Sequence, residues 1–440
     1  MRSTAGRQLG LVMCLFLGLA GTAQAGTVSI RIDATLLTEQ SFVIDSQGPA
    51  RSTKDVHSVD LTPGLHHFVT SGNTAGPSTI PFTVTPGGTI EYEPENDMIL
   101  GGRGSDTLAV IGVTIHVDAA ALNYRSLSVD GIVSFSPTPV ITLKLPPGRH
   151  EFLSSGNTAG PNYTYFTVTR SGVVDYGPEN DAFMSGRGSN TLVLKGWGID
   201  VDATALSYTH IAISGSDWLS PGQVIPRVFM PGNHDFNGPS NTAGYNYLYF
   251  KVTPDGRVDY GPEWDGILEG RGTRKLTVKG LRVTINARSI DHPMMSANGF
   301  GWRDSCEVLT LRLIPGLHDL NTPAANYSYV YFTLERSGIL SYDPSMNPVL
   351  SGRGTATLLV RGAVILLDAS KFQDDSVSVN NWKWLPARHI LPLVLMPGSH
   401  DIRRSGTNVS YTFEVTSAGT VLSTDPNLEI TGPGALRLLY

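Results

Sequence analysis

Residues Leu145–Phe152 read Leu-Pro-Pro-Gly-Arg-His-Glu-Phe, and the Pro-Gly-x-His pattern within this stretch occurs five times along the chain. The copies are spaced 84, 84, 84 and 82 residues apart, and their prolines are Pro63, Pro147, Pro231, Pro315 and Pro397. Proline presets φ at the first central position of a tight turn, and glycine tolerates a positive φ at the second. The pattern therefore predicts a turn between two strands in each copy of a repeated unit.

Two further patterns keep the same register. Gly-Arg-Gly is centred on Arg103, Arg187, Arg271 and Arg353, and the fifth copy has Gly432-Pro433-Gly434. An Asp or Asn followed by Ala occurs at Asp33, Asp118, Asp202, Asn286 and Asp368. Three independent patterns in one register indicate internal repetition. They divide the chain into five β repeats, at residues 27–111, 112–195, 196–279, 280–361 and 362–440.

Composition and alternation assign each repeat to the antiparallel β-sandwich class. The 440 residues include 48 Gly and 28 Pro, and only 16% are charged. Each repeat holds about seven short alternating runs, as in a small sandwich. We therefore expect an all-β chain of five tandem β-sandwich (Ig-like) repeats. The alternative is a five-bladed β-propeller-like ring, but one blade needs only about 40–50 residues and no half-repeat occurs within the unit.

The N-terminal residues 1–25 are typical of a secretory signal peptide. Arg2 and Arg7 precede an apolar run from Gly10 to Gly21, and Ala23-Gln24-Ala25 matches a cleavage site. We therefore expect a secreted protein, located outside the cell, at the cell surface or in the periplasm. The mature chain retains one cysteine, Cys306, which excludes an intrachain disulfide and which we expect to be a partly buried spectator. No later stretch is apolar enough for a membrane span, and a net charge of −6 without a basic block argues against nucleic acid as a partner.

A histidine recurs next to the Pro-Gly turn of every repeat, as His66, His150, His234, His318 and His400. It shares one strand face with the large apolar residue two positions later, for example Phe152. We interpret it as a structural histidine bonded to a backbone carbonyl. A metal site common to the repeats would need a second recurring ligand, and no other His or Cys recurs.

An acidic stretch precedes Gly-Arg-Gly, and it offers oxygen ligands of the kind that Ca²⁺ prefers. The candidate calcium ligands are Asp175, Glu179, Asp181, Asp259, Glu263 and Asp265. A purely structural loop is the alternative. Glu95, Glu179 and Glu263 lie eight residues before Arg103, Arg187 and Arg271, which predicts a salt bridge within each loop. No other cofactor is expected.

Tyrosine pairs mark the three inner repeats, on the strand face opposite the Phe-x-Val core pattern. They are Tyr163 and Tyr165, Tyr247 and Tyr249, and Tyr329 and Tyr331. Two interpretations stay open. Terminal repeats differ when a feature packs against a neighbouring repeat, which favours an inter-unit contact. A flat amphipathic ring also suits the face of a sugar or peptide, which favours a ligand platform.

Tryptophans recur in the variable loop before the third strand, as Trp218, Trp302 and Trp384. Loops on a rigid sandwich are common binding positions, so these rings are further candidates for stacking on a sugar. Closing the end of the sandwich is an equally good interpretation.

The sequence contains no Gly-x-Ser-x-Gly elbow, no His-Glu-x-x-His and no phosphate loop, so we do not expect an enzyme. The preferred hypothesis is a secreted, multivalent binding protein for a polysaccharide or another cell-surface glycan polymer, which would gain avidity from repeated sites. The alternative is a structural scaffold of the envelope or extracellular matrix that self-associates through its repeats. A third hypothesis is a secreted glycan-processing enzyme.

Overall fold

The computed structural model describes residues 26–439, apart from 71–73, 75, 132, 138–139, 155–157, 161, 240–241, 243, 299–300, 323–327, 373 and 407–408. The signal peptide predicted at residues 1–25 lies outside this range. Within it, the chain forms ten sheets, two for each repeat. We number these sheet pairs modules 1 to 5 in chain order.

The first two modules have the same elements. Module 1 comprises β1 (Val28–Asp33), β2 (Ser41–Ile44), β3 (Gln47–Ser52), β4 (Val56–Leu61), β5 (Gly64–Thr70), β6 (Thr79–Val84), β7 (Ile90–Glu91), η1 (Pro94–Asn96), β8 (Leu100–Gly101) and β9 (Thr107–Val110). Module 2 comprises β10 (Val113–Asp118), β11 (Leu127–Val129), β12 (Val133–Phe135), β13 (Ile141–Leu145), β14 (Gly148–Ser154), β15 (Asn162–Val168), β16 (Val174–Asp175), η2 (Pro178–Asn180), β17 (Met184–Ser185) and β18 (Thr191–Leu194).

The remaining modules repeat this order with small variations. Module 3 comprises β19 (Trp197–Asp202), β20 (Ala212–Ile213), β21 (Ile225–Phe229), β22 (Gly232–Asn237), β23 (Tyr247–Val252), β24 (Val258–Asp259), η3 (Pro262–Trp264), β25 (Leu268–Glu269) and β26 (Lys275–Val278). Module 4 comprises β27 (Leu281–Asn286), β28 (Met294–Ala297), β29 (Arg303–Asp304), β30 (Val308–Leu313), β31 (Gly316–Thr322), β32 (Ser328–Leu334), β33 (Leu340–Ser341), η4 (Pro344–Met346), β34 (Leu350–Ser351) and β35 (Thr357–Val360). Module 5 comprises β36 (Ala363–Asp368), β37 (Ser376–Val379), β38 (Lys383–Pro386), β39 (Ile390–Leu395), β40 (Gly398–Arg404), β41 (Ser410–Val415), β42 (Val421–Leu422), β43 (Leu428–Gly432) and β44 (Ala435–Leu438).

Each module is a two-sheet sandwich, which confirms the predicted fold class. In module 2 one sheet has the order β13-β10-β18-β17 and the other the order β12-β11-β14-β15-β16. The first and last long strands of the module, β10 and β18, pair in parallel, and the other pairings are antiparallel. The inward side chains of both sheets are fully buried, including Ile115, Phe152 and Phe166.

Two details of the modules differ from the sequence-based expectation. The Pro-Gly turn carries the chain from β13 to β14, which belong to different sheets, so it joins the two layers and does not close a hairpin. The modules also have eight or nine strands where about seven were expected. One of the extra strands arises because part of the variable segment pairs onto the sheet edge, as β12 does with β11.

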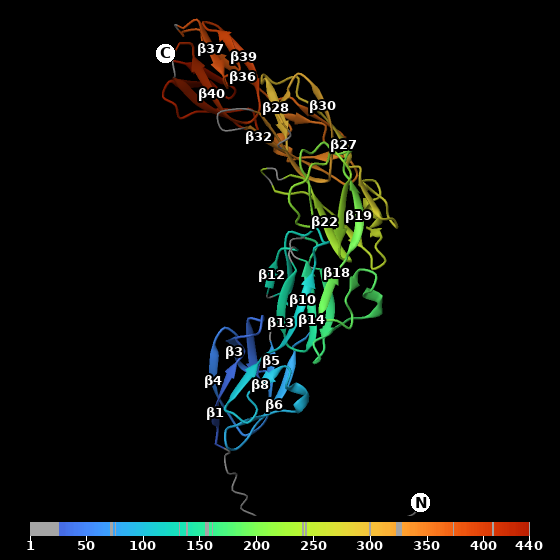
Figure 1. Ribbon diagram of the computed structural model, residues 1–440. Coiled ribbons are helices and arrows are strands. Elements are labelled where there is room, and N and C mark those ends of the chain that lie inside the picture. The colour runs from blue at the N-terminus through green and yellow to red at the C-terminus, as the bar shows by residue number, and fades with distance from the viewer. Residues whose placement is uncertain are drawn as a thin grey trace, which may run out of the picture.

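The modules follow one another along a gentle arc, with module 1 and module 5 at opposite ends (Figure 1). The ring alternative is therefore wrong, and the modules form an open, rod-like arc. In the described part of the chain, no helix is long and apolar enough to cross a membrane. Cys306 is a free thiol and is exposed, in contrast to the partly buried position that was expected.

The recurring histidine is a buried structural residue, as predicted. In every module its Nε2–H donates to the backbone carbonyl four residues earlier, at 2.7–2.9 Å. The residue that faces Nδ1 differs between modules and is Asp45, Asp130, Ser214, Asn298 or Asn380. Burial lowers the pKa of His234, His318 and His400 to about 4. The pKa of His150 is instead raised, because its hydrogen bond and ion pair with Asp130 outweigh the desolvation caused by burial.

Consecutive modules interlock through side chains that bond the backbone of the next module. Thr38 donates its backbone N–H to the carbonyl of Lys144 and accepts from the N–H of Lys144 at its hydroxyl, at 2.9 and 2.7 Å. Asn123, Ser207 and Asp291 bond the next module in the same way. Asn162 adds a two-point contact to the backbone of Asn233, at 2.6 and 2.7 Å. Such directional bonds fix the orientation of each module against the next, which supports a stiff rod.

Candidate functional site

The tyrosine pairs lie on the outer face of the five- or four-stranded sheet of modules 2, 3 and 4. Along β15 the side chains alternate between buried and accessible positions, with Asn162, Thr164 and Phe166 inside. The paired rings are nearly parallel, with centroids 6.4 Å apart for Tyr163–Tyr165, 6.3 Å for Tyr247–Tyr249 and 6.3 Å for Tyr329–Tyr331. Tyr163, Tyr249 and Tyr331 remain 39–40% exposed. The predicted pairs therefore form short ladders of flat rings that face solvent.

Module 3 extends its pair into a ladder of four rings. Tyr245 packs against Tyr247 at 6.2 Å, and Trp218 stacks on Tyr245 at 6.1 Å with an interplanar angle of 23°. Trp218 and Tyr245 are 46% and 48% exposed. Tyr245 was missed at the sequence level, although its spacing of two from Tyr247 continues the same alternation and was the signal for it.

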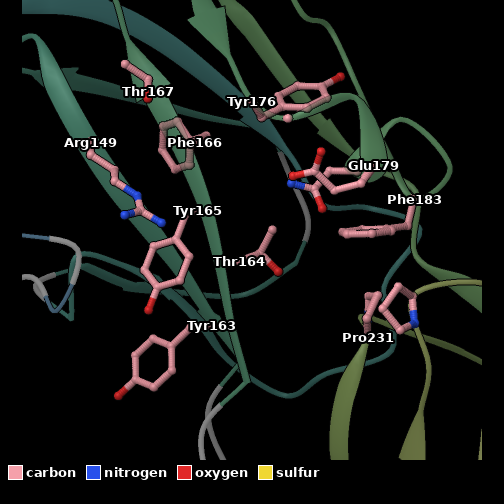
Figure 2. A pocket seen from close by; sticks show the side chains of 13 residues that line it. Arg149, Tyr163, Thr164, Tyr165, Phe166, Thr167, Tyr176, Glu179, Phe183 and Pro231 are labelled. Carbon is pink, nitrogen blue, oxygen red and sulfur yellow. The ribbon is translucent and has the colours of Figure 1, made fainter.

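A groove lies beside the tyrosine pair of module 2 and encloses about 420 Å³. One wall carries Tyr163, Tyr165 and Arg149, and the guanidinium of Arg149 lies 4.3 Å from the centre of the Tyr165 ring (Figure 2). The opposite wall carries Tyr176, Glu179 and Phe183 (Figure 2). Pro231 and Pro254 of module 3 complete the lining. The groove therefore combines aromatic faces with one cation and one carboxylate.

Module 3 has a corresponding groove of about 550 Å³. Tyr249, Tyr260 and Glu263 occupy the places of Tyr165, Tyr176 and Glu179. Lys251 supplies the cation, Asp259 adds a second carboxylate and Trp264 adds an aromatic side chain. Trp264 is an aromatic residue that the sequence analysis did not single out, because it replaces an asparagine of the acidic stretch in a single repeat. The candidate residues Tyr249, Asp259 and Glu263, chosen for different reasons, thus meet in one groove.

The tyrosines also contact the preceding module. The hydroxyls of Tyr165, Tyr249 and Tyr331 lie 3.5, 3.5 and 3.0 Å from the hydroxyls of Thr74, Thr158 and Thr242. Each of these threonines donates its backbone N–H to a carboxylate of the next module, as Thr158 does to Asp235 at 2.6 Å. The two interpretations of the tyrosine pairs are therefore compatible, because the hydroxyls touch a neighbouring module while Tyr249 and Tyr331 stay 40% exposed.

The arginine of Gly-Arg-Gly pairs with a different acid from the one expected. Arg187 donates to Asp181 at 2.7 Å, and Arg103 and Arg271 bond Asp97 and Asp265 at 2.6 Å. Arg187 also lies 4.9 Å above the ring of Tyr176. The prediction of a pair with Glu179 is wrong, because the short η2 helix turns Glu179 back over Gly177 and toward the groove.

The calcium prediction for the acidic stretch stays a prediction. Asp175 and Asp181 flank Arg187, at 3.9 and 2.7 Å from guanidinium nitrogens, and Asp259 and Asp265 flank Arg271 at 3.9 and 2.6 Å. In the described ranges, the group of three ligand-bearing side chains with ligand atoms within 4.8 Å of one another lies elsewhere, at Glu39, Asp130 and His150.

The tryptophans of the variable segment occupy three different local settings. Trp218 belongs to the ladder of module 3, and Trp302 directly precedes β29 and is 38% exposed. Trp384 is 51% exposed and lies within β38, where it pairs with Ser378 of β37. The expected loop is thus an edge strand in module 5, and Trp218 is joined to the tyrosine ladder of module 3.

Comparisons with models of protein families and with curated proteins found no match. Among solved structures, the chain is similar to the pilus adhesin SpaC from Lactobacillus rhamnosus GG, with 12% sequence identity and a TM-score of 0.21. The alignment covers 94% of this chain and 55% of the adhesin chain. The chain therefore spans about half the length of that adhesin, and a likeness at this level carries no argument about function.

Proposed function

We propose that this protein is a secreted, non-catalytic binding protein that holds a glycan polymer at several modules. The observation that carries the proposal is the ladder of four aromatic rings in module 3, from Trp218 to Tyr249, next to a groove with charged side chains. Three of these rings are 40–48% exposed. Contiguous exposed aromatic surface on a folded protein marks binding sites, because exposing it to water costs free energy.

The chemistry of the ladder and groove fits a carbohydrate. Flat aromatic rings suit the apolar faces of sugar rings, and Tyr hydroxyls remain available for hydrogen bonds at the ring edge. Lys251, Asp259 and Glu263 in the adjoining groove can bond sugar hydroxyls. Calcium held by the acidic stretch would be an additional route to sugar hydroxyls, and it stays part of the proposal.

A screen of polysaccharides on immobilised chain 26–440, with and without a calcium chelator, tests the proposal. Trp218→Ala combined with Tyr245→Ala should weaken binding at least about tenfold, since buried aromatic anchors contribute more than 1 kcal/mol each. Leu65→Ala with Val364→Ala removes apolar side chains outside the ladder that are even more exposed, at 64% and 63%, and should leave binding unchanged.

A structural scaffold is the second candidate, and the interlocked junctions favour it. In that case the ladders are contacts between chains. The same Trp218→Ala and Tyr245→Ala changes would then abolish self-association and would not change glycan binding. Release of reducing ends from a polysaccharide by the purified chain would instead establish the enzyme hypothesis.

A further inference from the structure

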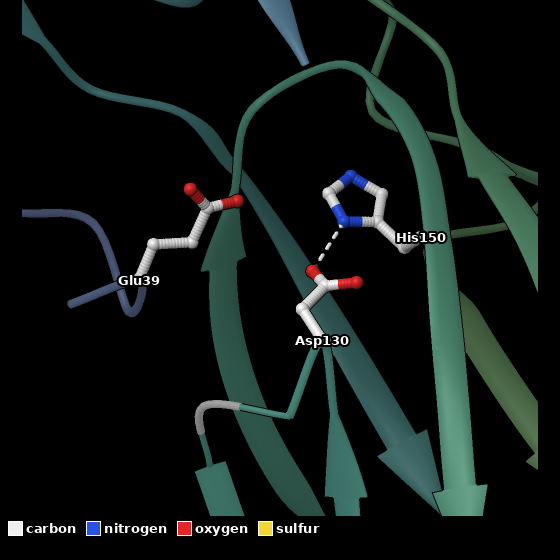
Figure 3. A group of neighbouring side chains, drawn as sticks. All are labelled: Glu39, Asp130 and His150. Carbon is white, nitrogen blue, oxygen red and sulfur yellow. Dashed lines mark hydrogen bonds and ion pairs between the residues drawn. The ribbon is translucent and has the colours of Figure 1, made fainter. Parts of the chain in front are cut away.

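One junction between modules contains a cluster of ionisable side chains that the binding proposal does not use. Glu39 lies between β1 and β2 of module 1, while Asp130 follows β11 and His150 lies on β14, both in module 2 (Figure 3). Their carboxylate and imidazole ligand atoms all lie within 4.8 Å of one another. The Thr38–Lys144 backbone contact holds the Glu39 segment in this position.

The cluster is buried and has an unsatisfied oxygen. Glu39, Asp130 and His150 are 3%, 1% and 0% exposed. Asp130 accepts from His150 Nδ1 at 2.7 Å and from the Glu151 N–H at 2.9 Å, whereas Oε2 of Glu39 has no hydrogen-bond partner. A buried polar oxygen without a partner costs free energy, and a bound cation would remove this cost.

The other junctions provide an internal comparison. At the position of Glu39, the next modules carry Tyr124, Tyr208 and His292. At the position of Asp130 they carry Ser214, Asn298 and Asn380, each facing the recurring histidine. In the part of the chain that the structure describes, the two acids therefore occur together at one junction, and the next two junctions replace both with neutral groups.

The next two junctions satisfy their neutral groups without an ion. The hydroxyl of Tyr124 accepts from the N–H of Met230 at 2.9 Å, and that of Tyr208 accepts from the N–H of Ile314 at 3.1 Å. Packing at a junction thus does not require an acid, and the pair of acids at the first junction has another cause.

The donor set matches a transition-metal ion. One imidazole nitrogen and two carboxylate oxygens suit Zn²⁺, whereas Ca²⁺ and Mg²⁺ prefer oxygen ligands alone. Nε2–H of His150 already donates to the carbonyl of Pro146 at 2.8 Å, which leaves Nδ1 facing the two carboxylates. Metal-binding histidines usually anchor their second nitrogen in this way.

We propose that Glu39, Asp130 and His150 form a binding site for a divalent transition metal, best represented by Zn²⁺, at the junction of modules 1 and 2. Metal binding releases the Nδ1 proton of His150, so that the two carboxylates and the neutral imidazole balance the charge of one dication, and a water completes the four ligands. The metal replaces the hydrogen bond between Asp130 and His150, so the two side chains separate slightly while Glu39 closes in. The ion then ties the first two modules together, independently of whether the ladders bind a glycan.

Calorimetric titration of Zn²⁺ into chain 26–440 tests the site, in a Cys306→Ser background that removes the exposed thiol. The chain is first refolded with and without Zn²⁺, so that slow entry into a buried site does not obscure the result. We expect one Zn²⁺ per chain and a higher melting temperature, and we expect no comparable effect of Ca²⁺ or Mg²⁺.

Two variants locate the ion. Asp130→Asn with Glu39→Gln should abolish the tight site. Glu39→Tyr with Asp130→Ser should also abolish Zn²⁺ binding, and because it gives the junction the neutral groups of the next one, the variant should still fold. His234→Gln changes the matching histidine of the second junction and should leave Zn²⁺ binding unchanged. No Zn²⁺ binding, or a stoichiometry that survives the Glu39→Tyr and Asp130→Ser exchange, would overturn the proposal.

Discussion

At the scale of single residues, one position in modules 2 to 4 sets the charge state of a buried histidine. Asp130, Ser214 and Asn298 all face Nδ1 of the module's histidine at 2.5–2.8 Å. A carboxylate there stabilises the imidazolium, whereas a hydroxyl or amide donates to a neutral ring. The recurrence of the histidine could be predicted from the sequence, but its charge state depends on a partner about 20 residues away and could not.

Replacing Ser214 with Asp should raise the pKa of His234 well above its value of about 4. Ser214 and Asp130 share a left-handed backbone, with φ of 48° and 52°, so the new carboxylate can adopt the place that Asp130 has beside His150. An NMR titration of the imidazole checks this. The Ser214→Asn variant, which copies module 4, serves as the control and should leave the pKa low.

Stability should fall in mild acid because several buried histidines resist protonation. The pKa of His234, His318 and His400 is about 4 in the folded chain, against an ordinary value of 6.5. Between these values the unfolded chain binds protons that the folded chain excludes. The free energy of unfolding therefore decreases as the pH falls from 6.5 to about 4, by on the order of 3 kcal/mol per histidine.

Denaturant titrations at a series of pH values measure this loss. His234→Gln, which keeps an amide N–H for the carbonyl of Met230, should remove its share of the pH dependence. If the free energy of unfolding of this variant depends on pH as steeply as that of the unchanged chain, His234 is not responsible for the loss of stability in acid.

At the scale of elements, the alternating pattern predicted the strands well and their partners less well. The outward tyrosines and inward phenylalanines of β15 and β23 follow directly from the period of two. The pattern did not predict that the Pro-Gly turn connects the two sheets, because the same turn motif can join strands of one sheet or of two. The arginine of Gly-Arg-Gly was paired with the wrong acid because η2 rotates Glu179 away, and no local pattern had indicated that helix.

The two glycines of Gly-Arg-Gly should differ sharply in their tolerance of a side chain. Both Gly186 and Gly188 have positive φ, of 99° and 77°. A Cβ at Gly186 would lie 1.8 Å from the carbonyl oxygen of Thr191, whereas a Cβ at Gly188 would meet nothing within 4 Å. Gly188→Ala should cost about 1 kcal/mol.

Gly186→Ala should cost several times more, because the backbone of β18 must move. Thermal unfolding of the two variants compares the costs directly. Equal melting temperatures for the two variants would contradict the described loop geometry.

At the scale of the whole molecule, the junctions turn five sandwiches into one arc-shaped rod (Figure 1). No linker separates consecutive repeats in the sequence, as at Leu194-Lys195-Gly196, which is typical of closely stacked units. The contacts themselves join residues 71 to 106 positions apart, as in Asn162–Asn233 and Tyr124–Met230, and no pattern within one repeat shows them. For the same reason the Glu39 cluster could not be found from the repeats, since its members belong to two modules.

Removing the two-point junction contacts should loosen the rod. Asn162→Ala with Asn246→Ala leaves the backbone groups of Asn233 and Leu317 without their partners, at a cost of about 1–3 kcal/mol for each junction. Small-angle scattering should then show a broader distribution of interatomic distances. Ser78→Ala is the matched control, because the hydroxyl of Ser78 at the equivalent position has no partner.

The central claim is that several modules bind one polymer through their aromatic ladders. The most direct measurement compares the affinity of chain 26–440 for the polysaccharide found by the screen with that of variants lacking one, two or three ladders. Removing Tyr163 and Tyr165, then Tyr247 and Tyr249, then Tyr329 and Tyr331 should lower the affinity stepwise, by about 10²–10⁴-fold in total. Affinity that stays constant across the series, with melting temperatures unchanged, would contradict the account.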